Sequence, residues 1–370
     1  MNKKGKKVLQ LCHGYAPPFD DVARQWARLF DSSDYQLTTI FLTGEENQQV
    51  AKNVGGEVLF WEYTSKDLRG LKRGLVKRLR NICQEKSFDV CVAQRYKATY
   101  LALSIHGLKV VGVNHAYGVY DRWLRRLCVL RQKDRLLLVG VSNAIRDDIR
   151  QAMPSFPAEK IQTVYNHIDV LPVKRNQVDR EEARSFLNLS GENYIFGAVG
   201  RLHPDKDYET LISGFAKVSE KMRDAHLVII GRGELEETLI AQADTLGVGD
   251  RVHLLGFVKD ACRYFKGFDS FVLSSDHEPF GMVLLEAMLA EIPIVYSDCG
   301  GAPEVVGSLG LSFQVGDSED LSNALFDIYR KKGELGQGQL TDRVNNYFSD
   351  FAVTDKFWDM PVLRGFLGRY

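Results

Sequence analysis

Two series of short apolar segments, each alternating with amphipathic segments, follow one another along this chain. The apolar segments of the first half are rich in Val, Leu and Ile and rarely alternate with polar residues, which is typical of strands buried on both faces of a sheet. Strands are predicted at residues 7–13, 36–43, 57–61, 88–93, 109–114 and 136–142. Helical periodicity predicts helices at residues 21–30, 68–82, 119–130 and 143–153.

The second half repeats this alternation. Strands are predicted at residues 194–199, 226–230, 252–255, 270–273, 293–296 and 311–315. Helices are predicted at residues 208–222, 234–246, 261–265, 282–290 and 321–330. Because one hydrophobic core seldom extends over 370 residues, two such series predict an α/β protein with two doubly wound, Rossmann-like domains.

These patterns also set expected domain limits. We expect an amino-terminal domain over residues 1–172 and a carboxyl-terminal domain over residues 173–345, with the polar stretch 173–182 (VKRNQVDREE) as the linker. Residues 346–370 are expected to form a segment that packs back on the amino-terminal domain. Ligands of open α/β sheets bind beyond the carboxyl ends of the strands, so two domains of this kind predict a ligand-binding cleft between them.

Charge is divided unevenly between the two halves. Residues 1–170 carry 27 Lys and Arg against 17 Asp and Glu, a net charge of +10, and the remaining residues carry the opposite charge. This split favours an anionic partner for the first half alone, although variation between two domains would also produce it. No apolar run reaches the roughly 18 residues of a membrane span, and none has the length of a signal-peptide core. The six cysteines form no CxxC pair, so a cytoplasmic protein is expected.

Residues suited to binding a diphosphate follow predicted strands of the second half. Arg201 and Lys206 come after the strand at 194–199 and supply positive charge. A helix predicted to begin near Gly281 offers the amides of Gly281, Met282 and Val283 to an anion. An exposed arginine such as Arg201, taken alone, would more often form a surface ion pair. The combination after successive strands favours a phosphate site.

Two carboxylates lie on either side of that helix start. Glu278 precedes it, and Glu286 lies about one and a half turns inside the helix, among apolar residues. A carboxylate in such surroundings is costly unless it accepts hydrogen bonds, which ribose hydroxyls could donate. The alternative for Glu286 is a position on the solvent-facing side of the helix.

The segment 278–288 (EPFGMVLLEAM) resembles the E-x7-E signature of the family-four retaining glycosyltransferases, which have the GT-B fold of two Rossmann-like domains facing across a cleft. The turns at 200–201, 231–233, 256–257 and 300–304 match that family in order and spacing. The resemblance implies that Arg201 and Lys206 bind the donor diphosphate and that Glu278 contacts the donor sugar. It further assigns donor contacts to the following residues: Gly231, Phe257, Val258, Gly281, Met282, Val283 and Glu286.

Two positions in the first half carry part of the same resemblance. The family has a glycine-rich loop after the first strand that approaches the donor sugar or the acceptor. This chain has only Gly14 there, and the resemblance assigns a donor contact to it. His115, after the strand at 109–114, resembles a family histidine near the transferring sugar, although a lone histidine is more often structural. His167 stands where the family usually has a glycine, which leaves a left-handed backbone there in question.

Two further sequence patterns suggest a metal site or a dinucleotide site, but each departs from the motif that it resembles. Asp205-Lys206-Asp207 spells the D-x-D metal signature of another glycosyltransferase fold, but the central lysine opposes a divalent ion. The turn at 231–233 lacks the third glycine of a dinucleotide fingerprint. We therefore expect no metal and no cofactor.

A basic segment at residues 66–80 has leucines at helical spacing. Its charged residues include Lys72, Arg73, Lys77 and Arg78, and a second basic cluster occupies residues 122–135. The segment could contact an acceptor or lie on an anionic membrane surface. Alternatively, it is a solvated helix whose leucines pack onto the sheet.

The resemblance implies retaining transfer of a hexose from a nucleotide sugar, with UDP-hexose as the expected donor. It extends to enzymes of lipopolysaccharide core assembly. The expected acceptor is therefore an anionic glycolipid or oligosaccharide, reached by peripheral contact with the inner face of the cytoplasmic membrane, and no nucleic acid is expected as a partner. The alternatives are a UDP-sugar epimerase of GT-B shape and a non-catalytic nucleotide-sugar-binding protein.

Overall fold

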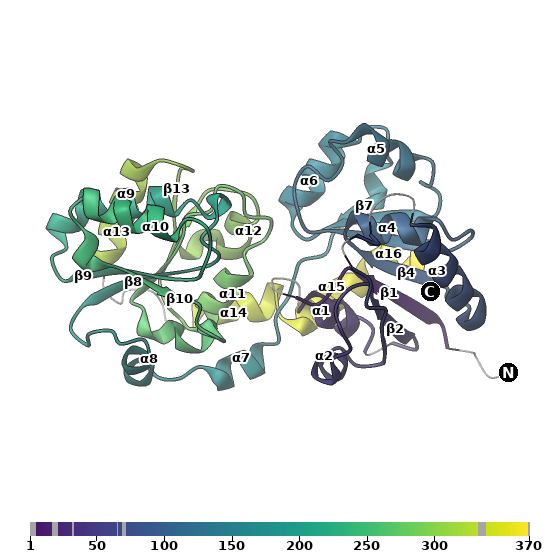
Figure 1. Ribbon diagram of the computed structural model, residues 1–370, viewed down its shortest axis with the longest axis horizontal. Coiled ribbons are helices and arrows are strands. Elements are labelled where there is room, and N and C mark those ends of the chain that lie inside the picture. The colour runs from purple at the N-terminus through teal and green to yellow at the C-terminus, as the bar shows by residue number, and fades with distance from the viewer. Residues whose placement is uncertain are drawn as a thin grey trace. The chain divides into compact units, whose positions relative to one another are not determined.

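The computed structural model describes residues 5–16, 21–31, 33–64, 66–68, 72–331 and 338–368. The chain forms two compact units (Figure 1). Unit 1 comprises Met1–His167 and Asp350–Tyr370, and unit 2 comprises Ile168–Ser349. Each unit contains one parallel sheet with helices, which confirms the prediction of two Rossmann-like α/β domains. No helix in the described ranges is both long and apolar enough to cross a membrane.

Unit 1 is built on a seven-stranded sheet of order β3-β2-β1-β4-β5-β6-β7. All pairings are parallel, and β1 lies between β2 and β4, with Leu9 opposite Thr38 and Cys91. The order reverses between β1 and β4, which is where ligands bind in such sheets. The strands are β1 (Lys7–Cys12), β2 (Gln36–Phe41), β3 (Glu57–Phe60), β4 (Val90–Gln94), β5 (Lys109–Asn114), β6 (Leu136–Gly140) and β7 (Ile161–Thr163).

The helices of unit 1 come from both ends of the chain. They are α1 (Val22–Arg28), α2 (Gln48–Val54), α3 (Arg73–Lys86), α4 (Arg95–Leu103), α5 (Trp123–Leu130), α6 (Asn143–Ala152), α15 (Asp350–Asp359) and α16 (Pro361–Leu367). The sequence pattern does not predict α2 or α4. In α2 only Val54 is buried, and in α4 the buried residues occupy most of the helix, so neither has a clear apolar stripe.

Unit 2 has a six-stranded parallel sheet of order β10-β9-β8-β11-β12-β13. Its strands are β8 (Tyr194–Val199), β9 (Ala225–Ile230), β10 (Val252–Gly256), β11 (Ser270–Leu273), β12 (Ile294–Ser297) and β13 (Leu311–Phe313). Its α-helices are α7 (Val170–Asn176), α8 (Arg180–Phe186), α9 (Tyr208–Val218), α10 (Glu236–Thr245), α11 (Met282–Leu289), α12 (Ala302–Val306), α13 (Ser318–Arg330) and α14 (Gln339–Tyr347).

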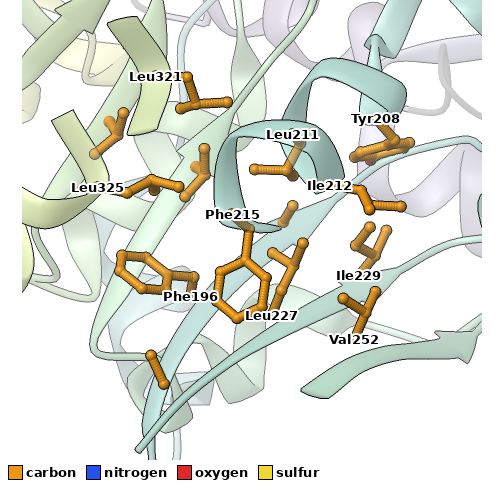
Figure 2. Packing of buried hydrophobic residues seen from close by; sticks show 14 of the residues in the cluster. Phe196, Tyr208, Leu211, Ile212, Phe215, Leu227, Ile229, Val252, Leu321 and Leu325 are labelled. Carbon is orange, nitrogen blue, oxygen red and sulfur yellow. The ribbon is translucent and has the colours of Figure 1, made fainter. Parts of the chain in front are cut away.

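One hydrophobic cluster of unit 2 joins strands of the sheet to helices α9 and α13 (Figure 2). Phe196 of β8 and Phe215 of α9 are fully buried, with ring centroids 6.2 Å apart. Burying a side chain of this size contributes roughly 1.5–3 kcal/mol. Helix α13 packs against α9 so closely that a β-carbon at Gly214 would lie 2.9 Å from Leu321. The connection between β8 and α9 carries Arg201 and Lys206.

The polar stretch 173–182 is largely helical, so its prediction as a linker is wrong. It contributes to α7 and α8, and it lies inside unit 2. Asp179 caps α8 by accepting a hydrogen bond from the Glu182 amide at 2.9 Å. A capping aspartate and a charged outer face make a short surface helix look like a linker in sequence.

Buried and partly buried polar contacts attach the segment that forms α15 and α16 to the rest of unit 1. Asp350 accepts hydrogen bonds from Arg24 at 2.7 Å and from His167 at 2.6 Å. Burial opposes the ionisation of Asp350, but the hydrogen bond from His167 and the charge of Arg24 outweigh it and lower the pKa of this carboxyl. Trp358 donates to the Leu29 carbonyl at 2.7 Å. His167 therefore serves this attachment, and its backbone does not have a positive φ.

Candidate functional site

The loops that follow β8, β9 and β11 carry most of the residues predicted to bind a donor. These three strands are neighbours in the sheet, with β8 in the middle. Arg201 and Lys206 follow β8, Gly231 follows β9, and Glu278 follows β11. Because all pairings are parallel, their carboxyl ends lie at one edge of the sheet. Unit 2 thus brings these residues to one place.

Gly231 is required by the packing of two backbones. A β-carbon there would lie 1.7 Å from the Gly200 carbonyl oxygen, which no side chain permits. A β-carbon on Gly200 would lie 2.8 Å from the hydroxyl of Tyr208. The Gly231 amide donates to the Gly256 carbonyl at 2.8 Å, which ties the ends of β9 and β10 together. Both glycines therefore allow the loops after β8 and β9 to pack closely against each other at the site.

Lys206 and Glu278 form an ion pair at the centre of this group. The Nζ of Lys206 lies 2.8 Å from Oε2 of Glu278, and the Oγ of Ser275 lies 3.3 Å from both atoms. Glu278 is buried, with 7% of its surface exposed. The Ser274 hydroxyl donates to the Lys206 carbonyl at 2.7 Å, which fixes the loop that carries the lysine. The pair joins the β8 loop to the β11 loop.

Arg201 has little structural role of its own. Its side chain is 60% exposed and its guanidinium lies 3.5 Å from Asp205. An exposed pair at this distance contributes little to stability. The guanidinium therefore remains accessible to an anion beside Lys206.

Helix α11 begins next to this ion pair. Gly281 is its N-cap, has φ of 97°, and as a glycine has no side chain to cap the helix. A β-carbon at Gly281 would lie 2.8 Å from Leu284, so both the backbone and the space favour glycine. The amides of the first helical turn precede regular intrahelical bonding, and Met282 and Val283 are half-buried there. This helix start offers amide donors and the positive end of a dipole to an anion.

Glu286 lies on α11 and is half-buried. Burial and then the charge of Glu286 raise the pKa of the Cys262 thiol to about 12. Cys262 belongs to the 3-10 helix η5 (Ala261–Gly267), which follows the loop of Phe257 and Val258. Phe257 is 66% exposed. Glu286 and this apolar loop thus lie near the same short helix.

The two aspartates of the D-x-D sequence have separate structural partners. Asp207 caps α9 by accepting from the Thr210 amide at 3.2 Å, and burial raises the pKa of this carboxyl although that hydrogen bond opposes the effect. Asp205 contacts His203 and Arg201. Among the residues that the structure describes, no group of three or more His, Cys, Asp or Glu is placed to hold a metal ion.

In unit 1, Gly14 and His115 line one cavity of about 430 Å³ at the ends of β1 and β5. A β-carbon at Gly14 would lie 2.6 Å from the Thr43 hydroxyl oxygen, so this loop packs tightly on the end of β2. Nε2 of His115 lies 2.8 Å from Oε1 of Gln94. Burial and then the charge of Arg95 lower the pKa of His115 to about 3. The imidazole is therefore neutral at physiological pH.

The basic segment 66–80 has a packed and a solvated face. Helix α3 begins at Arg73, later than predicted, and buries Leu75 and Leu79. The Nζ of Lys72 lies 5.0 Å from the Tyr100 ring centre, and Arg78 lies 4.6 Å from that of Trp61. Leu71 falls outside the described residues. The leucine face is covered by unit 1, and Arg73 and Lys77 stay exposed.

Sequence reasoning missed the serines that organise the ion pair. Ser274 and Ser275 follow β11 in the run Leu273-Ser274-Ser275-Asp276. Small polar residues directly after a buried parallel strand are the signal that could have indicated them. Ser275 also accepts, through its carbonyl, from the Ser297 hydroxyl at 2.6 Å, which ties the site to β12.

Comparison with known families divides the chain in two. Residues 21–170 match the model of Glycosyltransferase Family 4, and residues 179–341 match that of Glycosyl transferases group 1. Among curated proteins, the uncharacterized glycosyltransferase MJ1607 of Methanocaldococcus jannaschii is 28% identical over 55% of this chain. The lipopolysaccharide core biosynthesis glycosyltransferase LpsE of Rhizobium meliloti is 29% identical over 47% of this chain. The matches span 53% and 51% of those two proteins, about half of their length.

A solved structure shares the fold over nearly the whole chain. The Anabaena protein Alr3699/HepE in complex with UDP superposes with a TM-score of 0.78 at 20% identity, covering 95% of this chain and 98% of that one. At this identity the likeness shows the fold. Both Rossmann-like units therefore follow the GT-B arrangement of strands and helices.

Proposed function

Since the chain belongs to the GT-B glycosyltransferases, with a family 4 domain followed by a group 1 domain, we propose that it transfers a hexose from UDP-hexose to a carbohydrate acceptor with retention of configuration. The observation that carries this proposal is the Lys206–Glu278 ion pair beside the first turn of α11. It combines a cation and amide donors for a diphosphate with a carboxylate for sugar hydroxyls.

In this proposal unit 2 holds the donor. Arg201, Lys206 and the amides of Gly281, Met282 and Val283 bind the diphosphate. Three further contacts complete the set: Glu278 accepts from the hexose, Glu286 accepts from the ribose, and the base lies along Phe257 and Val258, while Gly231 keeps the backbone low enough for close approach. The binding of UDP by the Anabaena protein of the same fold supports a uridine nucleotide as donor.

The chemistry we propose is mainly electrostatic. Negative charge grows on the diphosphate as the bond to the hexose breaks, and Arg201, Lys206 and the helix amides stabilise that charge in the transition state. The acceptor hydroxyl attacks from the face that the diphosphate leaves and gives its proton to the departing phosphate. Neutral His115 then serves as a hydrogen-bonding partner for the hexose rather than as a general acid. No metal or cofactor takes part.

We propose an anionic glycolipid or oligosaccharide of lipopolysaccharide core assembly as the acceptor. The net charge of +10 over residues 1–170 and the similarity to LpsE support this assignment. The enzyme would reach such an acceptor by peripheral contact with the membrane surface. Arg73 and Lys77 of α3 supply charge for this contact, and α5 exposes Trp123 and Leu124 among arginines.

The test is release of UDP from UDP-hexose with and without a phosphorylated core oligosaccharide, with the anomeric configuration of the product assigned by NMR. Release that depends on acceptor and a product of retained configuration are expected. Interconversion of UDP-hexoses without acceptor would instead identify an epimerase. Binding without turnover would identify a nucleotide-sugar-binding protein.

A further inference from the structure

Two adjoining cavities lie at the carboxyl ends of β1, β4 and β5 in unit 1. Their volumes are about 430 Å³ and 290 Å³, and both are lined by His13, Arg95 and His115. They lie where the strand order of the sheet reverses, between β1 and β4. Gly14 and His115 are predicted to contact the donor, and the other residues that line the cavities have no part in the proposed donor binding.

The charge around these cavities has one sign. Arg95, Lys97 and Arg125 line them, and no described residue in either lining is a carboxylate. Within the described part of the chain, Lys97 forms no ion pair. Arg125 donates to the Val119 carbonyl at 2.9 Å and lies 4.8 Å from the Tyr96 ring centre. It forms no ion pair with any residue that the structure describes.

Neighbouring groups respond to this charge. Burial, followed by the charges of Lys97 and Arg95, lowers the pKa of His13. Burial and the same Lys97 charge lower the pKa of Lys72 at the start of α3. The positive potential therefore extends from the cavities toward the basic face of α3.

Two buried polar atoms at the cavities lack partners. Gln94 is 3% exposed, and its Oε1 is occupied by His115, whereas its Nε2 has no hydrogen-bond partner among the described residues. The Nδ1 of His13 is likewise unpartnered there. A buried donor without a partner is destabilising, because it has given up its hydrogen bonds to water. An acceptor atom bound in the cavity would satisfy the Gln94 amide.

We propose that these cavities form an oxyanion site in which Arg95, Lys97 and Arg125, with the Gln94 amide, bind a phosphate or carboxylate group of the acceptor. That the bound group belongs to a sugar acceptor rests on the proposed glycosyl transfer. The binding of an oxyanion in these cavities does not. The negative group supplies a hydrogen-bond acceptor for the Gln94 amide and compensates the charge of Lys97. The site orients the sugar acceptor by its charged substituent and leaves the reacting hydroxyl near His115.

The experiment is calorimetric titration of the full chain with inorganic phosphate and, separately, with succinate, in saturating UDP to occupy the donor site. At least one of the two anions should bind, which also tells phosphate from carboxylate recognition. Lys97→Gln should weaken that binding about tenfold, the usual effect of losing one charge-assisted hydrogen bond. Arg95→Asn should do the same, because Arg95 has φ of 72° and asparagine tolerates this backbone.

Lys133→Gln is the matched control, since it removes one exposed charge from unit 1 outside both cavities. Absence of phosphate and succinate binding in the wild type would overturn the proposal, as would equal weakening by Lys133→Gln. The two proposals fail separately. If oxyanion binding depends on Lys97 but the protein turns over no nucleotide sugar, the oxyanion-site proposal stands and the glycosyltransferase proposal is wrong. If the protein turns over UDP-hexose but binds neither anion, the glycosyltransferase proposal stands and the oxyanion-site proposal is wrong.

Discussion

At the scale of single residues, the structure adds to the sequence motif an ion pair between Lys206 and Glu278. The motif predicts both residues for the donor site, and their positions after β8 and β11 agree with ligand binding at strand ends. Their 2.8 Å ion pair and its link to Ser275 do not follow from sequence, because they depend on how two loops 72 residues apart pack. A bound diphosphate would compete with Glu278 for the lysine. If Lys206 binds the donor as proposed, the ion pair with Glu278 positions its ammonium group before the diphosphate binds.

Arg201→Ala and Lys206→Ala should each lower turnover on the order of a hundredfold, because charge on the departing diphosphate loses a partner. The melting temperature should separate them. Arg201 is exposed and its loss should leave stability unchanged, whereas Lys206→Ala leaves buried Glu278 unpaired and should lower stability. Steady-state kinetics and thermal unfolding measure both effects, with Lys331→Ala as the exposed control. Turnover close to wild type in either variant would remove that residue from the mechanism.

The aspartates of the D-x-D sequence give a second prediction. Asp207 caps α9 and Asp205 contacts Arg201 and His203, so neither is expected to serve a metal. Turnover by the wild-type protein in excess EDTA should equal its turnover without EDTA. Loss of turnover in EDTA that magnesium or manganese restores would show that a metal takes part.

The stacked pair His226 and His253 makes stability depend on pH. Their ring nitrogens lie 2.8 Å apart. Burial lowers the pKa of both, and charge repulsion from His253 and then from Arg251 adds to the effect on His226. Folded-state pKa values below the ordinary value of about 6.5 mean that the unfolded chain binds more protons. This contribution to stability is thus complete above about pH 6.5 and is lost as pH falls through the lowered values.

We therefore expect the melting temperature to fall between pH 7 and pH 5, and to fall less in His253→Gln, which keeps a neutral hydrogen-bonding side chain. His106→Gln, which changes an exposed histidine, is the control and should follow the wild type. An identical pH profile for His253→Gln and the wild type would contradict this account.

At the scale of elements, strands were easier to predict than helices. The strand at residues 109–114 and those at 194–199 and 270–273 agree with the structure to the residue, because continuous apolar runs mark strands buried on both faces. Helix α4 was missed because burial on most sides removes the amphipathic period. A helix was predicted at residues 68–82, whereas α3 begins only at Arg73 and continues to Lys86.

The two exposed basic helices of unit 1 make a prediction for membrane contact. The apolar residues Trp123 and Leu124 of α5 are 63% and 61% exposed. Changing both to Ser should reduce co-sedimentation with anionic vesicles at any salt concentration. Changing Arg73 and Lys77 of α3 to Gln should reduce it mainly at low salt, since each basic residue near an anionic surface contributes about 1 kcal/mol that salt screens.

Lys331→Gln is the charge control for this measurement, because it lies in unit 2 and is exposed. Vesicle binding that is unchanged in both pairs of substitutions would show that neither helix contacts the membrane. The leucines of α3 are not part of the test, since Leu75 and Leu79 are buried within unit 1.

At the scale of the whole molecule, Asp350 helps to join the carboxyl-terminal helices to the rest of unit 1. This carboxylate contacts Arg24 and His167, and α15 and α16 follow it. Asp350→Asn should lower the melting temperature of unit 1 by several degrees, since losing a charge-assisted hydrogen bond costs about 1.5–3 kcal/mol. Differential scanning calorimetry would measure it, with the exposed Asp355→Asn of α15 as control. Equal melting of the two variants would show that the contact is dispensable.

The discontinuity of unit 1 also has a consequence for synthesis on the ribosome. Unit 2 is one continuous stretch, Ile168–Ser349, whereas unit 1 takes α15 and α16 from the chain that follows it. During translation the whole of unit 2 emerges before those two helices, so the later domain can finish folding while the earlier one still exposes Trp26 and Phe30, which contact Phe357 in the finished protein. A nascent chain stalled once residue 349 has left the exit tunnel should therefore resist protease over unit 2 and be cut within unit 1.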